Sequence, residues 1–206
     1  MGDFETPDAG GPPAGAASGP QSKDFETPDA GGPPAGAASG PQSRDFDDLL
    51  AANRTYAETF ELGGFDGIAH AGVAVVTCMD SRMDPLRMLG LRPGDAKIFR
   101  NPGGRVNPLA LEALVLAVHL LSVRRVLVVP HTRCAVAGTT QSEIRQRIEE
   151  VSGQRASWQS FHTVPDQLEA LGEDVLKVRT HPLIPEGVTV GGFVYDVDTG
   201  LLEQKF

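Results

Sequence analysis

Residues 73–82 read VAVVTCMDSR, and this stretch joins two different kinds of sequence. Its first part, VAVVTC, is an apolar run rich in β-branched residues and without polar alternation, which is typical of a strand buried on both faces. Its second part adds a carboxylate, a hydroxyl and a guanidinium group directly after the cysteine. The stretch therefore predicts a buried strand of a parallel sheet, with reactive side chains at its carboxyl end.

Similar elements are predicted along the rest of the chain. Further strands are predicted at residues 96–100, 126–130, 188–195 and 201–204. Helices are predicted at residues 45–60, briefly from Asp84-Pro85, at 107–121 from Asn107-Pro108, at 140–151 from the capping box of Thr140 and Glu143, and from Pro165 to 178. Strands separated by helices predict an α/β fold with a mainly parallel central sheet flanked by helices.

The N-terminal segment differs from everything that follows it. A 21-residue unit beginning DFETPDAGGPP occupies residues 3–23 and again 24–44, and the copies differ only at Lys23 and Arg44. Each unit offers a single phenylalanine among Pro, Gly, Ala and Ser, which is too little apolar surface to form a core. We expect residues 1–44 to be a disordered spacer and residues 45–206 to be one domain. The alternative is a tether whose repeated motif binds an unknown partner.

The charge and the cysteine content exclude several classes of protein. A net charge of -9 without a basic stripe argues against nucleic acid as a partner. No apolar run of about 18 residues occurs and the N-terminus is acidic, so no membrane association is expected and the expected location is cytoplasmic. The chain has only 2 Cys, which cannot build a disulfide scaffold but suit a metal site.

The two cysteines fall at neighbouring strand ends of the predicted sheet. Cys78 ends the first strand, and His131-Thr132-Arg133-Cys134 follows the third. Two thiolates and an imidazole are ligands that suit tetrahedral Zn²⁺, with the fourth position left open. Zinc lowers the pKa of bound water to about 7, so the site suits hydration or hydrolysis. A disulfide between the cysteines is the less favoured alternative, because it would leave His131 without a role.

Asp80 and Arg82 stand on either side of one residue just after the first strand. A guanidinium group can hold a carboxylate through two charge-assisted hydrogen bonds. When it is held by Arg82, Asp80 can accept a hydrogen bond from water at the zinc ion. When it is released, Asp80 can take the fourth metal position and close the site.

Three ordered motifs carry a family resemblance: Cys78-Met79-Asp80-Ser81-Arg82, the RNPGG segment of residues 100–104, and His131-x-x-Cys134. Together they resemble the β-carbonic anhydrases over roughly residues 46–206, and the GGFVYDVDTG segment of residues 191–200 is similar to the end of the compact actinobacterial-type members. The resemblance implies a lyase in which Cys78, His131 and Cys134 bind zinc and Asp80 and Arg82 form the catalytic dyad. It implies reversible hydration of carbon dioxide to bicarbonate, by a homodimer or tetramer.

The segment of residues 131–135, called the metal loop below, departs from the family pattern at two positions. The family usually has glycine directly after the second cysteine, where this chain has Ala135, and Arg133 replaces a residue that is often small or acidic. If the backbone at position 135 needs a positive φ, alanine costs about 1 kcal/mol and displaces Cys134. Arg133 is expected to place a positive charge beside the metal.

Two other functions fit the same residues. One is a hydrolase of carbon disulfide or carbonyl sulfide that uses the same site. The other is a catalytically silent, zinc-stabilised domain that binds bicarbonate or a protein partner.

Overall fold

The structure is a computed structural model, which describes residues 44–206. The repeated segment lies outside the described residues, so the expected spacer stays a prediction. The chain divides after Glu58 into two compact units, and each is described by itself. In the first unit, a 3-10 helix (Arg44–Phe46) leads into α1 (Asp47–Ala57). The helix is thus shorter than the predicted residues 45–60 and ends with Glu58 as its C-cap.

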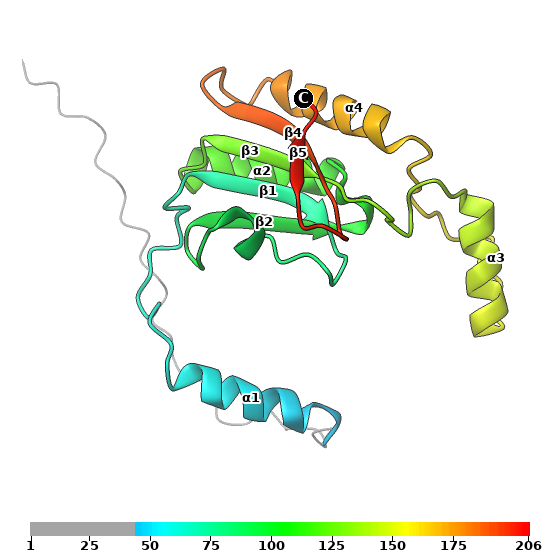
Figure 1. Ribbon diagram of the computed structural model, residues 1–206, viewed down its shortest axis with the longest axis horizontal. Coiled ribbons are helices and arrows are strands. Elements are labelled where there is room, and N and C mark those ends of the chain that lie inside the picture. The colour runs from blue at the N-terminus through cyan, green and yellow to red at the C-terminus, as the bar shows by residue number, and fades with distance from the viewer. Residues whose placement is uncertain (1–43) are drawn as a thin grey trace, which may run out of the picture. The chain divides into compact units, whose positions relative to one another are not determined.

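The second unit is built on a five-stranded sheet in the order β2-β1-β3-β4-β5 (Figure 1). The strands are β1 (Val73–Cys78), β2 (Ala96–Asn101), β3 (Arg125–Val129), β4 (Thr189–Tyr195) and β5 (Leu202–Gln204). The first four are parallel to one another, and β5 pairs with β4 in the antiparallel direction. The predicted α/β fold with a mainly parallel sheet is confirmed.

The helices of this unit begin near the predicted signals. They are α2 (Pro108–Leu120), α3 (Gln141–Ser152) and α4 (Gln167–Arg179), with short 3-10 helices at Arg87–Leu89 and Pro102–Gly104. The Asn107 side chain accepts a hydrogen bond from the Ala110 amide at 2.9 Å, and Thr140 with Glu143 forms the predicted capping box. The start of α4 was predicted wrongly at Pro165. The N-cap is Asp166, whose carboxylate accepts hydrogen bonds from the amides of Leu168 and Glu169. Proline has no side-chain acceptor and cannot cap the helix in this way.

Each face of the sheet has its own apolar core. Alternate residues of β1 point to opposite faces, so that Ala74 and Val76 pack with α2 and α4 while Val73 and Val75 pack against the other cluster. That second cluster includes residues of the β1–β2 connection, such as Leu89 and Leu91. All six residues of β1 are buried, as the unbroken apolar run predicts. No helix within residues 44–206 is long and apolar enough to span a membrane.

The topology places one edge of the sheet where a site is expected. From β1 the chain goes to β2 on one side, and it returns through α2 to β3 on the other side of β1. In open α/β sheets, ligands bind outside the carboxyl ends of the strands at such a switch point. A ligand site is therefore expected at the carboxyl ends of β1 and β3.

Candidate active site

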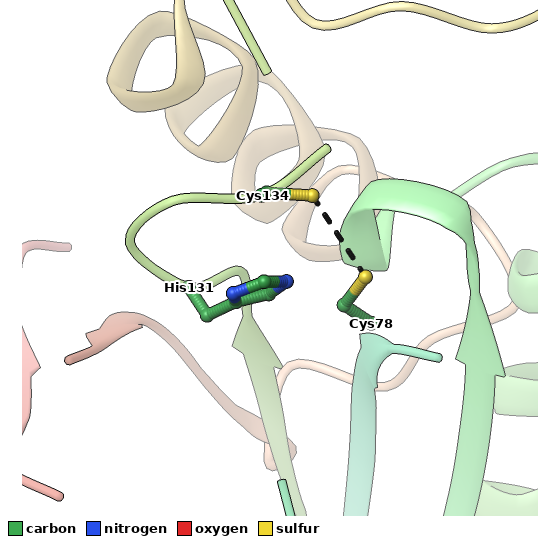
Figure 2. A group of neighbouring side chains, drawn as sticks. All are labelled: Cys78, His131 and Cys134. Atoms are coloured by element: carbon green, nitrogen blue, oxygen red, sulfur yellow. Dashed lines mark hydrogen bonds between the residues drawn. The ribbon is translucent and has the colours of Figure 1, made fainter. Parts of the chain in front are cut away.

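Cys78, His131 and Cys134 meet at the carboxyl ends of β1 and β3 (Figure 2). Their ligand atoms all lie within 4.8 Å of one another, and the two sulfur atoms are 3.9 Å apart. All three residues are buried, and His131 has 0% of its surface exposed. The structure thus brings together the three residues that the sequence suggests as metal ligands. Both cysteines are free thiols, so the alternative of a disulfide is not what the structure contains.

The imidazole of His131 is oriented for a ligand. Its Nδ1 atom donates a hydrogen bond to the carbonyl oxygen of Thr132 at 2.8 Å, which leaves the lone pair on Nε2. Nε2 is buried and has no hydrogen-bond partner among the described residues. A buried polar atom without a partner is costly, and a metal ion would satisfy it. The donor set of two sulfurs and one imidazole nitrogen fits zinc.

The two thiols have unequal acidity because they share a hydrogen bond. The bond with Cys134 lowers the pKa of Cys78 to about 4, although burial acts in the opposite direction. The pKa of Cys134 is raised, because it keeps the shared proton beside the Cys78 thiolate and is itself buried. The shared hydrogen bond therefore favours the thiolate form of Cys78. Metal ligation requires this deprotonated form.

The strained residue of the metal loop is Arg133, with φ of 54°. Ala135 is not among the described residues with positive φ, so the expected strain at this position is corrected. One left-handed residue inside the loop turns the chain so that Cys134 faces Cys78, and this residue lies before the cysteine rather than after it. The Arg133 guanidinium forms an ion pair with Asp198. The positive charge expected at Arg133 is thus paired with a carboxylate.

Asp80 and Arg82 form the ion pair that their spacing predicts. The Arg82 Nε atom donates to Oδ1 of Asp80 at 2.9 Å, and Nη2 donates to Oδ2 at 2.7 Å. These bonds hold the pKa of Asp80 well below its usual range, and the same pair raises the pKa of Arg82. Asp80 Oδ2 also lies 3.7 Å from Nε2 of His131. The carboxylate is thus held by arginine at the edge of the three-ligand cluster.

Strand β2 supports this loop through two residues of the RNPGG segment. The Arg100 side chain donates to the carbonyl oxygens of Cys78 at 2.8 Å and Asp80 at 2.5 Å. Gly104 has φ of 66°, and a Cβ atom there would lie 3.0 Å from the Cys78 amide nitrogen. The sequence predicts turn-forming glycines but misses both contacts. They depend on the pairing of β1 with β2, which local sequence does not encode.

A third support comes from α4, and the sequence contains no signal for it. The Gln167 side chain donates to the His131 carbonyl oxygen at 3.0 Å. Deeper in the unit, the Asp174 carboxylate is 1% exposed and accepts hydrogen bonds from Arg105, Lys177 and the Val106 amide. These charges link α4 to the segment that follows the glycines.

Comparison with known proteins agrees with this geometry. A family model described as carbonic anhydrase matches residues 73–202. The chain is 32% identical over 158 residues to beta-carbonic anhydrase 1 of Mycobacterium tuberculosis, covering 77% of this chain and 96% of that protein. The crystal structure of carbonic anhydrase from Streptococcus mutans superposes with a TM-score of 0.70 at 34% identity, covering 79% and 98% of the two chains.

A relative with a different named activity is also similar. Carbon disulfide hydrolase of an Acidianus species is 30% identical over 155 residues, covering 63% of this chain and 75% of that protein. The likeness is weaker in coverage than that to the mycobacterial protein.

Proposed function

The chain belongs to the β-carbonic anhydrase family, and on this premise we propose that it hydrates carbon dioxide reversibly to bicarbonate and a proton at a zinc site. The observation that carries the proposal is the orphan Nε2 atom of His131 beside two cysteine sulfurs. Cys78, His131 and Cys134 would hold the metal. When bound, zinc supplies a Lewis acid that makes water a nucleophile near pH 7.

The dyad has two tasks in this proposal. Asp80 is ionised at neutral pH because Arg82 lowers its pKa, so it can only accept hydrogen bonds. It therefore orients a water molecule at the edge of the cluster by accepting a hydrogen bond from it. Arg82 keeps this carboxylate from turning into the cluster, since both carboxylate oxygens are bonded to the guanidinium. The reaction needs Asp80 close to the metal but not bound to it.

The direct test is stopped-flow hydration of carbon dioxide with a pH indicator. Purified protein with zinc content measured on the same sample should exceed the buffer rate across about pH 7–9. A zinc-loaded sample that hydrates carbon dioxide no faster than buffer would refute the proposal. Asp80→Asn supplies the matched control, because it keeps the volume of the side chain and removes its charge.

Hydrolysis of carbon disulfide is a second candidate, which the similarity to carbon disulfide hydrolases favours. Sulfide release from carbon disulfide and carbonyl sulfide distinguishes it from hydration of carbon dioxide. The third candidate, a zinc-stabilised domain without catalytic activity, has less support than the sequence suggests. Ala135 has no positive φ, so it does not strain the loop that carries Cys134.

We also propose a homodimer or tetramer, as the family implies. The support is the apolar surface of the first unit, where Phe46 of the 3-10 helix and Leu49 and Leu50 of α1 are 59%, 62% and 51% exposed. Such surface is unfavourable in water and is typical of an interface between chains. Light scattering should give a mass above one chain, and Leu49→Glu with Leu50→Glu should reduce it. A monomeric wild-type protein would refute this part.

A further inference from the structure

The end of β4 and the connection from β4 to β5 contact the loop of residues 131–134 at three points. The Thr132 amide donates to the carbonyl oxygen of Tyr195 at 2.9 Å, and the Val197 amide donates to Oγ1 of Thr132 at 3.1 Å. The third contact is the ion pair between Arg133 and Asp198. The C-terminal hairpin therefore fixes both the backbone and a side chain of the loop that carries His131 and Cys134.

The same loop touches the dyad through one backbone atom. The carbonyl oxygen of Arg133 accepts a hydrogen bond from Nη2 of Arg82 at 3.3 Å. This nitrogen also donates to Oδ2 of Asp80 at 2.7 Å. A guanidinium nitrogen of this kind has two hydrogens, so it can serve both acceptors at once. The position of the Arg133 carbonyl thus helps to set the plane of the guanidinium that holds Asp80.

Arg133, whose carbonyl accepts this hydrogen bond, adopts the left-handed conformation with φ of 54°. This conformation is unfavourable for arginine, so surrounding contacts must maintain it. Asp198 provides one such contact. Its charge also adds to that of Asp80, the main cause, in raising the pKa of Arg82. Asp198 is therefore close enough to act on both arginines.

We propose that Asp198 is a positioning residue for the pair of Asp80 and Arg82. Its ion pair with Arg133 keeps the Arg133 carbonyl oxygen hydrogen-bonded to Arg82. Arg82 in turn keeps Asp80 away from the three candidate metal ligands. The inference rests on the proposed function for its catalytic meaning. Its geometric content concerns the Arg82–Asp80 pair, which can be observed without turnover. Loss of the Asp198 charge should loosen Arg82 and let Asp80 approach Nε2 of His131, 3.7 Å away.

Four variants of the full-length protein test the chain of contacts. Asp198→Asn removes the charge, and Arg133→Gly removes the partner side chain while accepting a positive φ. Exchange of the two residues, Arg133→Asp with Asp198→Arg, restores the pair with reversed polarity. Glu203→Gln is the matched control. It removes an exposed charge of the same hairpin, and that charge pairs with Lys205 instead of Arg133.

The first measurement is hydrogen exchange of the Arg82 Nε–H proton by NMR with ¹⁵N-labelled arginine, assigned with Arg82→Lys. This proton is bonded to Asp80. Both single variants should speed its exchange about two- to fivefold, the effect of one exposed ion pair. The exchanged pair should restore the wild-type rate, and Glu203→Gln should not change it. Equal exchange in wild type and both single variants would overturn the proposal.

The second measurement is the rate of carbon dioxide hydration at low and high salt. The value of kcat/KM should fall by the same two- to fivefold in Asp198→Asn, and the difference should shrink near 1 M salt, because salt screens exposed ion pairs. A fall that is independent of salt would indicate a purely structural role and overturn the proposal. If the wild type is inactive while Arg82 exchange still responds to Asp198, the proposed function fails and the positioning contact stands.

Discussion

The Oδ2 atom of Asp80 lies 3.7 Å from Nε2 of His131, the buried nitrogen that has no hydrogen-bond partner among the described residues. Among residues 44–206, two side-chain hydrogen bonds from Arg82 and one from its amide hold the carboxylate there. The site therefore contains both a candidate metal position and a candidate fourth ligand beside it.

Replacement of Arg82 by alanine should release this fourth ligand. Asp80 is then free to enter the cluster, and the rate of carbon dioxide hydration should fall about 100-fold, as expected when a catalytic group loses its position. Zinc content by elemental analysis should stay equal to that of the wild type. Arg82→Lys should retain part of the rate, because it keeps one donor. A normal rate in Arg82→Ala would contradict the assigned role.

Replacement of Cys134 by serine should remove the metal. The chain contains only 2 Cys, so neither thiol has a substitute. A serine hydroxyl is a weak zinc ligand, and we expect zinc per chain to fall from about one toward zero during dialysis against a chelator. Met79→Leu, at the exposed residue next to Cys78, provides a control that should keep its zinc. Equal zinc retention in Cys134→Ser and wild type would exclude Cys134 as a ligand.

Replacement of Gly104 by alanine should distort the end of β1. The added Cβ would lie 3.0 Å from the Cys78 nitrogen and 3.1 Å from the Thr77 carbonyl carbon, both of them backbone atoms. We expect a loss of about 2 to 4 kcal/mol in the free energy of unfolding, together with weaker zinc binding.

The matched control for Gly104 is Gly138→Ala. Gly138 has a similar φ of 68°, but an added Cβ there would meet no atom within 4 Å. It should lose only about 1 kcal/mol, the cost of the backbone conformation. Urea unfolding measures both variants, and equal losses would show that the contact with Cys78 does not matter.

Replacement of Asp174 by asparagine should leave Arg105 and Lys177 without their buried partner. Loss of one member of such a network costs about 3 kcal/mol or more in the free energy of unfolding. Glu173→Gln is the control, because Glu173 is mostly exposed and lies 3.6 Å from Arg105. It should change stability by less than about 1 kcal/mol. Urea unfolding of the two variants at pH 7 provides the comparison.

The loss at Asp174 should depend on pH. Burial raises its pKa, but hydrogen bonds from Arg105, Lys177 and Val106 outweigh burial and hold the pKa below its ordinary value. A carboxyl group with a lowered pKa stabilises the fold above the unfolded value of about 4, and this stabilisation is lost as the pH falls through the folded pKa. The difference between wild type and Asp174→Asn should therefore be full at pH 7 and shrink below about pH 4. A difference that grows in acid would contradict the assignment.

Local sequence predicts much of the fold because its signals act over a few residues. The unbroken apolar run of β1, the Asn107 cap and the Thr140–Glu143 capping box each contain their own physical cause. The start of α4 shows the limit. Proline favours a helix start through its fixed φ, but the hydrogen bonds of Asp166 determine where the first turn begins.

The sequence by itself determined which residues are available to this site: its two thiols, one imidazole and a closely spaced carboxylate and guanidinium. Only the tertiary structure decided how they are held. The pairing of β1 with β2 brings Gly104 against Cys78, and the hairpin brings Asp198 to Arg133, 65 residues away. It also placed the left-handed residue at Arg133 rather than Ala135. The physical reason is that backbone conformation in a tight loop depends on partners that are distant in sequence.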